Sequence, residues 1–456
     1  MKKALILLLF LPPASLTWLS CGSSPSSSAT VSGLKYRAFI TNSVSAGTAA
    51  AGVFIVDAAN DVRPVVSPIG AGNTPGMMVL TPNRTQTLVF SGIGTQFSDN
   101  QFSIINNAGE RNSAHVNLPG LTESFVVSPD SANAYVAVPT APVVGQSPGL
   151  VEAISLSSGN LTGEVEVPSV HYLSIDNSGN RVLGFSDNSD SVAVITPSNI
   201  GTNSPVVTFV SGFNRPVAAF FSSDDTTAYV VNCGAECGGT QASVQTLDLT
   251  TNMAGPSGVV CTPGGSPPCV GTLDLPAASV ALLNASTMYV AGTPVPPQPC
   301  PAGTAAQTCG LLTIVDLSTM TVTNSGIVIT DGYHNRIALG PNGQLFIGAH
   351  NCTEISTAAE TRGCLSIYNT LGSAVGSAPA GGVLIPPENG DATGIQPIVN
   401  RGINMAQDVT YVVQGGAVWV YDDTIDALEY NPNDPNNPGQ IMNLVGQFID
   451  VKTVDF

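Results

Sequence analysis

Six ionisable side chains occur at equivalent places in the sequence, just before or within an apolar stretch that opens a repeated segment. They are Glu123, His171, Arg215, His334, Arg336 and Asp391. If the segments form a ring, these side chains would line the mouth of its central channel. His171 and His334 would then make a ligand or metal site with carboxylates across the channel. The alternative is that each side chain is separately satisfied by neighbouring carbonyls and water.

Arg215 and Arg336 are the better candidates for contacts with anions, because the chain has only 13 Lys+Arg in total. His350 opens a long loop on the same predicted face. No nucleophile elbow, phosphate-binding glycine loop or His-Glu-x-x-His motif occurs. We therefore predict a binding site at the channel mouth, and we assign no catalytic residue, no cofactor and no metal.

The charge balance limits the possible partners. The chain of 456 residues has 13 Lys+Arg and 31 Asp+Glu, a net charge of 13 − 31 = −18, and only 10% charged residues. Such an acidic chain is a poor binder of nucleic acid or of anionic membranes. The 47 glycines and 34 prolines are too many for a helical protein.

The cysteines indicate an oxidising compartment. Setting Cys21 aside leaves eight of the nine cysteines, an even number. Sequence proximity suggests four local disulfides, and the C-x2-C spacing of a zinc ribbon is absent from the suggested pairs. The pairs are Cys233 with Cys237, Cys261 with Cys269, Cys300 with Cys309 and Cys352 with Cys364.

The N-terminal segment is typical of an export signal. A basic start and an apolar run of eight residues, 4–11, predict a signal peptide over residues 1–20. Ser20-Cys21 resembles a bacterial lipobox, although Trp18 stands where that motif usually has leucine. The resemblance implies lipidation of Cys21, a flexible tether over 21–34, and a lipid-anchored protein of the cell envelope at the outer membrane. Plain secretion is the alternative.

Internal repetition is the strongest signal for the fold. A short strand such as Tyr135-Val136-Ala137-Val138 recurs eight times, with steps of 49, 47, 47, 47, 60, 57 and 65 residues. Each unit has four short apolar stretches separated by turn residues, and no amphipathic helix. We predict an all-β protein, a β-propeller of eight four-stranded antiparallel blades over residues 35–456, with seven blades as the alternative.

The last segment is predicted to close the ring. No first strand fits before Tyr36, whereas a spare strand occurs at residues 449–454. We expect this C-terminal strand to complete the N-terminal blade, which leaves no open sheet edge at the joint. Asp57, Asp248, Asp316 and Asp422 each end a strand and are interpreted as turn residues rather than catalytic carboxylates.

Two copies of the repeat, Phe39-Ile40-Thr41-Asn42 and Tyr229-Val230-Val231-Asn232, resemble the Tyr-Val-Thr-Asn repeat of bacterial YVTN-type β-propellers. The phrase that runs from Ser128-Pro129-Asp130 to Tyr135-Val136 resembles the same repeat. The resemblance covers residues 36–456 and implies the fold. It carries almost no information about function, since that family includes binding proteins, surface-layer proteins and a few enzymes.

One face of the ring is expected to carry most of the long loops, at residues 43–52, 92–101, 139–150, 233–243, 293–311 and 350–364. Long loops on a rigid scaffold are where recognition usually occurs. We therefore expect a binding scaffold that presents this face to an envelope or extracellular protein or glycan, and that meets the membrane only through its lipid anchor. A propeller-type enzyme, lactonase-like or lyase-like, and a purely structural surface protein are the alternatives.

Overall fold

The computed structural model describes residues 31–43, 51–91, 100–202, 204, 206–300, 308–353, 355–356, 361–374, 379–386, 388–399, 408–423, 427–428 and 444–455. The predicted signal peptide, Cys21 and most of the tether lie outside these residues. The chain from Val31 onward clusters as one compact unit. Among its described residues, the regular secondary structure is β-strand apart from two short 3-10 turns, η1 (Pro197–Asn199) and η2 (Gly234–Cys237). No helix among them has the length and hydropathy needed to span a bilayer.

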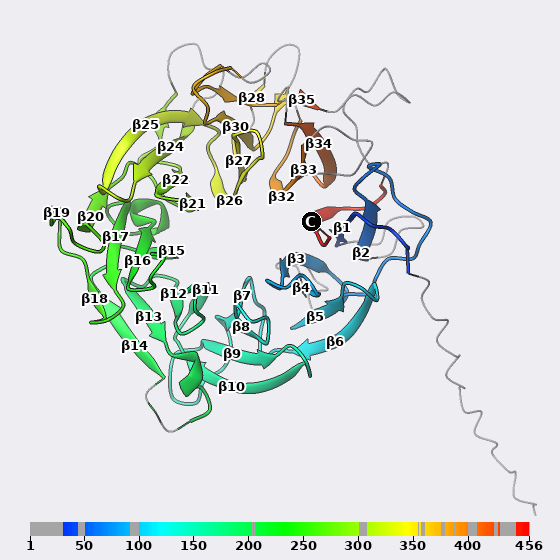
Figure 1. The fold of residues 1–456 in the computed structure, drawn as a ribbon, viewed down its shortest axis with the longest axis horizontal. Helices are drawn as coiled ribbons and strands as arrows, with labels where there is room; N and C mark the ends of the chain where they lie inside the picture. The colour runs from blue at the N-terminus through cyan, green and yellow to red at the C-terminus, as the bar shows by residue number, and fades with distance from the viewer. Residues whose placement is uncertain are drawn as a thin grey trace, which may run out of the picture. The chain divides into compact units, whose positions relative to one another are not determined.

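The described strands form eight antiparallel blades and one separate two-stranded hairpin, which confirms the predicted eight-bladed propeller (Figure 1). We number the blades 1 to 8 in chain order. First strands of neighbouring blades contact one another around the ring, as β36 does with β3 and β32. The first strands of blades 1 to 8 are β36 (Phe448–Thr453), β3 (Pro75–Leu80), β7 (Ser124–Val127), β11 (Val170–Ile175), β15 (Pro216–Phe221), β21 (Val280–Asn284), β26 (Tyr333–Leu339) and β32 (Ala392–Ile398).

The middle two strands of each blade carry the recurrent apolar pattern. The second strands are β1 (Arg37–Asn42), β4 (Gln86–Ser91), β8 (Asn133–Val138), β12 (Val182–Ser186), β16 (Thr227–Asn232), β22 (Thr287–Gly292), β27 (Gln344–His350) and β33 (Val409–Gln414). The third strands are β2 (Gly52–Asp57), β5 (Gln101–Asn106), β9 (Leu150–Ser155), β13 (Ser191–Ile195), β17 (Ser243–Asp248), β24 (Thr308–Asp316), β30 (Leu365–Asn369) and β34 (Ala417–Asp422).

The outer strands are the most variable part of the blades. They are β6 (Arg111–Asn117), β10 (Asn160–Glu166), β14 (Val207–Ser211), β20 (Cys269–Asp274), β25 (Thr321–Ile329), β31 (Val383–Leu384) and β35 (Ala427–Leu428). In blade 1 the bridge between Val53 and Ile69 takes the outer position. The remaining short strands are additions to blades 5, 6 and 7: β18 (Met253–Ala254), β19 (Val259–Cys261), β23 (Gln298–Pro299), β28 (Ile355–Ser356) and β29 (Thr361–Arg362).

Packing between blades explains why the middle strands are apolar on both faces. A strand inside a stack of sheets is covered on each side, so it reads as a continuous apolar run rather than as an alternation. The core cluster between blades 8 and 1, for example, joins Ile40 and Phe54 to Tyr411, Val418 and Phe448. Apolar clusters of this kind, between neighbouring sheets, form the core of the protein.

The ring closes as the sequence predicts. β36, at the C-terminal end of the chain, pairs antiparallel with β1, and Ile40 lies opposite Val451 (Figure 1). Asp450 is fully buried there, and its Oδ2 accepts a hydrogen bond from the Met78 backbone N–H of blade 2 at 2.8 Å. The closing strand therefore holds the second blade as well as the first.

Three of the four aspartates predicted to form turns do so, and the residues that follow Asp422 and Asp423 lie outside those described. Asp57 Oδ1 accepts the Ala59 backbone N–H at 3.0 Å. Asp248 Oδ1 accepts the Thr250 backbone N–H at 2.8 Å, and Asp316 Oδ1 accepts that of Ser318 at 2.9 Å. Between β7 and β8, Asp130 Oδ1 accepts the Ala132 N–H at 3.0 Å, next to Ser131 with φ 60°. These short turns lie on one face of the ring, which we call the trimmed face. The loops between second and third strands emerge on the opposite face, which we call the long-loop face.

Candidate functional site

The structure brings three of the six predicted mouth residues together and separates the other three. Glu123, His171 and Arg215 lie at the start of β7, β11 and β15, in blades 3, 4 and 5. The strands begin on the face that carries the long loops, so these side chains share it. His334, Arg336 and Asp391 have their own partners elsewhere, as described below.

His171 lies between two carboxylates. Its Nδ1 is 2.9 Å from Asp187 Oδ1, and its Nε2 is 3.1 Å from Glu123 Oε2. Burial would lower the pKa of His171, but the contacts with Glu123 and Asp187 outweigh burial and raise that pKa above its usual value. Its ring also stacks on Tyr172, with centroids 4.2 Å apart and planes at 8°. The imidazole is thus held in place and favoured in its charged form.

A pair of tyrosines joins distant blades at the mouth. Tyr172 on β11 and Tyr333 on β26 belong to blades 4 and 7, and their hydroxyl oxygens are 3.1 Å apart. Burial raises the pKa of both phenols, so each stays protonated and able to donate a hydrogen bond. Because the two blades are three positions apart in a ring of eight, the pair spans the mouth.

A cavity of about 280 Å³ lies beside this tyrosine pair. Its walls come from blade 4, from blade 5 and its disulfide loop, and from Tyr333 of blade 7. Polar and aromatic side chains alternate around it, as in small-molecule sites. The lining residues that carry the argument below are His171, Tyr172, Phe185, Asp187, Arg215, Glu236 and Tyr333.

Glu236 reaches the cavity from the disulfide loop of blade 5. The Cys233–Cys237 bond closes a loop with a sequence separation of 4, which holds η2, and Gly238 ends that turn with φ 79°. Glu236 Oε2 accepts the Thr293 backbone N–H at 3.0 Å. Burial raises the pKa of Glu236 to about 7, against the lowering effect of hydrogen bonds from Thr293 and Ser279. This carboxyl can therefore change charge near neutral pH.

Arg215 is held at the rim by blades 4 and 5. It has φ 55°, and its backbone N–H donates to Asp190 Oδ1 at 3.1 Å. The guanidinium lies 3.8 Å from the same oxygen and donates to the Gly238 carbonyl at 3.5 Å. The Arg215 guanidinium, which we expected to bind an anion, therefore already has partners within the protein.

His334 is buried between blades and is not part of the mouth. Its side chain is fully covered, and Nε2 donates to the Thr330 carbonyl at 2.9 Å. Burial lowers the pKa of His334 to about 4, which keeps the ring neutral. The predicted pairing of His171 with His334 does not occur. The described residues include no group of three or more His, Cys, Asp or Glu arranged to hold a metal ion.

Arg336 links blades through its hydrogen bonds, and its guanidinium also interacts electrostatically with Tyr172 and Tyr333. Nε donates to the Thr393 carbonyl of blade 8 at 2.9 Å, and one terminal nitrogen lies 2.8 Å from Met77 Sδ of blade 2. Burial lowers the pKa of Arg336, although nearby Asp450 opposes this. A bulge between His334 and Arg336 explains why two residues on one strand have different surroundings.

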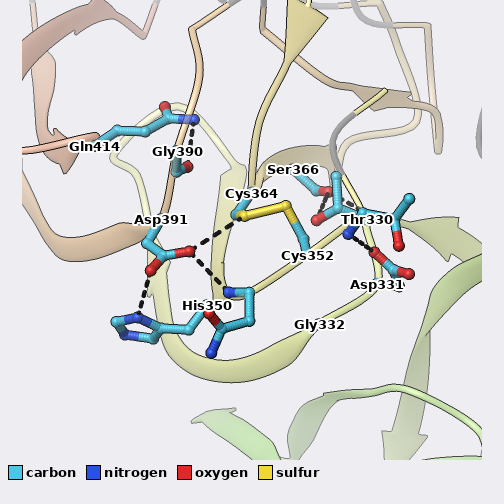
Figure 2. The surroundings of a disulfide bond; sticks show 12 residues. Thr330, Asp331, Gly332, His350, Cys352, Cys364, Ser366, Gly390, Asp391 and Gln414 are labelled. Carbon is cyan, nitrogen blue, oxygen red and sulfur yellow. Dashed lines mark hydrogen bonds and ion pairs between the residues drawn. A yellow bond between two sulfur atoms is a disulfide. The ribbon is translucent and has the colours of Figure 1, made fainter. Parts of the chain in front are cut away.

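Asp391 belongs to a separate cluster at the Cys352–Cys364 disulfide (Figure 2). Its Oδ2 lies 3.3 Å from His350 Nδ1, and Oδ1 accepts the Asn351 backbone N–H at 2.7 Å. Figure 2 shows Asp391 pointing between the histidine and the disulfide. The cluster ties the long loop of blade 7 to the start of β32 in blade 8. All four predicted disulfides are confirmed.

Four titratable side chains of the cavity were missed by sequence reasoning: Tyr172, Asp187, Glu236 and Tyr333. Two signals would have found part of this set. Tyr172 and Tyr333 each neighbour a histidine at the start of a first strand, and Glu236 is the carboxylate inside the shortest predicted disulfide loop. Asp187 follows β12 without a distinguishing pattern.

Two larger hollows lie away from this site. One, of about 720 Å³, is formed by turns of the trimmed face such as Gly340 to Gly343. The other, of about 700 Å³, lies at the outer edge of blade 5 beside the Cys261–Cys269 hairpin and is lined mainly by threonine, proline and glycine. Neither brings a histidine, arginine or lysine to its lining.

No family model matches the chain, and no curated protein matches it. Among solved structures, the chain is similar to the dihydro-haem d1 dehydrogenase NirN in complex with DHE, with TM-score 0.55 and 11% identity over 92% of this chain and 75% of that one. Hydrazine synthase of Kuenenia stuttgartiensis gives TM-score 0.49 and 14% identity over 77% of this chain and 96% of that one. A functionally unknown protein from Desulfotomaculum acetoxidans DSM 771 gives TM-score 0.46 and 15% identity over 76% and 98%.

At these identities the likeness is one of fold, and the score for NirN alone among the three exceeds 0.5. The resemblance to the YVTN repeat stays a prediction, because no family model matches. The sheets and the comparison agree that residues 31–456 form an eight-bladed β-propeller.

Proposed function

We propose that this protein is a lipid-anchored binding scaffold of the bacterial cell envelope, and that its long-loop face recognises an envelope protein or glycan. The observation that carries the proposal is the convergence of His171, Tyr172, Arg215, Glu236 and Tyr333 on one cavity at that face. Clefts with a few convergent polar groups and a shifted pKa are the usual places for ligand recognition.

The stapled loops support a recognition face. Cys233–Cys237, Cys300–Cys309 and Cys352–Cys364 lie in long loops of the consecutive blades 5, 6 and 7. A loop held in one conformation loses less entropy when it binds a partner. The three disulfides thus favour a preorganised binding surface over a purely structural role.

The cellular location rests on two features of the chain. Four disulfides are typical of a non-cytoplasmic, oxidising compartment. The lipobox-like Ser20-Cys21 after an apolar segment supports lipidation of Cys21 and anchoring at the envelope. Secretion without a lipid is the alternative.

In-cell photo-crosslinking tests the recognition face. A photoreactive residue replaces Val144 or Thr240, exposed positions in two long loops, and as a matched control it replaces Asp130 or Asn180, exposed positions in turns of the trimmed face. We expect the first pair to yield a discrete crosslinked protein or glycan species, and the second pair to yield none. Equal crosslinking from both faces, or none from either, would contradict the proposal and favour a purely structural surface protein.

A propeller-type enzyme is the second candidate, and one observation favours it. His171 between two carboxylates could move a proton, and Glu236 with its raised pKa has the character of a general base. Turnover of a supplied lactone by the intact protein, lost when Glu236 is replaced by Gln, would make this the primary function.

A further inference from the structure

The cavity beside the tyrosine pair has a definite size and wall composition. At about 280 Å³ it lies just below the roughly 300 Å³ lower end of small-molecule sites. It therefore suits a compact ligand or one end group of a larger partner. Tyr172, Tyr333 and Phe185 supply aromatic surface, and Glu236 supplies a carboxyl from the disulfide loop of blade 5.

The charges around this cavity have a surplus of acid. Two carboxyl groups, of Asp187 and Glu236, line the cavity, and those of Glu123 and Asp190 lie next to its lining residues. Three cations stand against these four, since His171 and Arg215 line the cavity and the Arg336 guanidinium interacts electrostatically with Tyr172 and Tyr333. His171 is matched by Glu123 and Asp187, and Arg215 by Asp190. Within the described part of the chain, Glu236 has no Lys, Arg or His at ion-pair distance. Glu236, which lines the cavity, is thus a carboxyl group that has no positive side chain of these residues as its partner.

Other ligand classes fit these walls less well. An anion would meet the carboxyl groups of Glu236 and Asp187, in a protein with a net charge of −18. The terminal nitrogens of Arg215 already contact Asp190 and the Gly238 carbonyl, and its buried Nε has no hydrogen-bond partner among the described residues. A bare metal ion would need several converging oxygen or nitrogen ligands, and the described residues hold no such group. A cation with an apolar body fits both the carboxyl and the aromatic rings, since ring faces attract positive charge.

We propose that this cavity binds a small organic ammonium group, a protonated primary amine carried on a ring or short apolar chain. The ammonium pairs with Glu236, and the body of the ligand packs against Tyr172 and Tyr333. This inference rests on the proposed function and deepens it, because the cavity becomes the specificity pocket of the long-loop face.

Titration calorimetry on the mature chain tests the pocket with three probes of similar size: 2-phenylethylamine, 2-phenylethanol and 3-phenylpropionate. We expect the amine to bind about tenfold more tightly than the alcohol, since one ion pair at a partly dry site suffices for that factor. The carboxylate should bind more weakly than the alcohol.

Two variants locate the interaction. Glu236→Gln should lower amine affinity to that of the alcohol, whereas Glu166→Gln, an exposed carboxyl on β10 outside the cavity, should leave both affinities unchanged. Tyr333→Leu should weaken amine and alcohol alike, and Tyr333→Phe should weaken neither by more than about twofold, because it keeps the ring. The tyrosine variants keep the test decisive if Glu236→Gln fails to fold.

Equal affinity for amine and alcohol, preference for the carboxylate, or absence of binding by all three probes would overturn the inference. These outcomes are separable from failure of the proposed function. If face-specific crosslinking persists while the amine does not bind, only the ligand class is wrong. If the amine binds while crosslinking shows no face preference, the pocket exists but the scaffold function does not.

Discussion

Glu236 shows how one disulfide loop can set the charge state of a site. The loop buries the carboxyl next to the Thr293 N–H, and burial raises the pKa of Glu236 to about 7 from an ordinary 4.5. The same residue stands beside His171 and Asp187 in the cavity wall. The charge of the pocket is therefore sensitive to pH near neutrality.

The raised pKa of Glu236 predicts that the stability difference between the parent chain and Glu236→Gln depends on pH. From pH 4.5 to about 7 the folded chain keeps a proton on Glu236 that the unfolded chain has released, so this residue lowers stability as the pH rises through that interval. Glu236→Gln cannot ionise. At about pH 8 it should be more stable than the parent by about 1–2 kcal/mol, since solvent screening reduces the roughly 3 kcal/mol of a fully buried group.

Urea unfolding measures this difference, and at about pH 4 the two chains should be equally stable, because Glu236 is then protonated in both states. Glu166→Gln serves as the control and should change stability by less than about 0.5 kcal/mol at either pH. A variant that is destabilised equally at both pH values would show that the ionised carboxyl is not the cause.

At the scale of elements, the disulfide loops differ in the side chains that they position. Cys233–Cys237 closes a sequence separation of 4 and positions Glu236, whereas Cys352–Cys364 closes a separation of 12 and carries the His350–Asp391 pair (Figure 2). The first loop lines the cavity and the second does not. Removing each bond should therefore have distinct effects on stability and on binding.

The chain-entropy model predicts the stability costs. Replacing Cys352 and Cys364 by Ser should cost about 3 kcal/mol, and replacing Cys233 and Cys237 about 2 kcal/mol, because the longer loop gains more freedom in the unfolded state. Amine binding should fall only in the second variant. Chemical unfolding and calorimetry check these outcomes, and equal loss of binding in both variants would contradict the assignment of Glu236 to its loop.

At the scale of the molecule, closure depends on β36. This strand pairs with β1, buries Phe448 and Val451, and places Asp450 against the Met78 N–H. At the other end of the strand, Arg84 donates to the Thr453 carbonyl at 2.6 Å. Blades 1 and 2 both depend on these contacts.

Truncation after residue 446 should therefore abolish cooperative unfolding of the whole ring, because it exposes the edge of β1 and leaves Met78 N–H without its acceptor. Differential scanning calorimetry and hydrogen exchange at β1 and β3 measure this loss. Val451→Ala provides the graded comparison and should cost roughly 2 kcal/mol while keeping one transition. A truncated chain that melts in the parent's single transition would show that β36 is dispensable.

The sequence alone determined the blade count, the strand pattern, the closing strand and all four disulfide pairs. The blade count, the strand pattern and the disulfide pairs depend on neighbouring residues or on a fixed repeat, as in Cys233 and Cys237 or in Tyr135 and Tyr229. The closing strand pairs residues far apart in the sequence, Ala38 with Thr453, and was inferred from the first strand that the N-terminal blade lacks. The tertiary structure decided which polar groups meet. Tyr172 and Tyr333 are 161 residues apart and touch only because blades 4 and 7 share a ring.

The same reason explains why the six residues predicted at the mouth do not all lie together. A bulge turns His334 into the packing between blades and leaves Arg336 to link blades 8 and 2, while Asp391 joins the loop cluster of blade 7. Side-chain direction at a bulge depends on local backbone geometry that residue type does not encode. Position along the repeat therefore located the correct face, and only the folded ring selected Glu123, His171 and Arg215 from the six candidates.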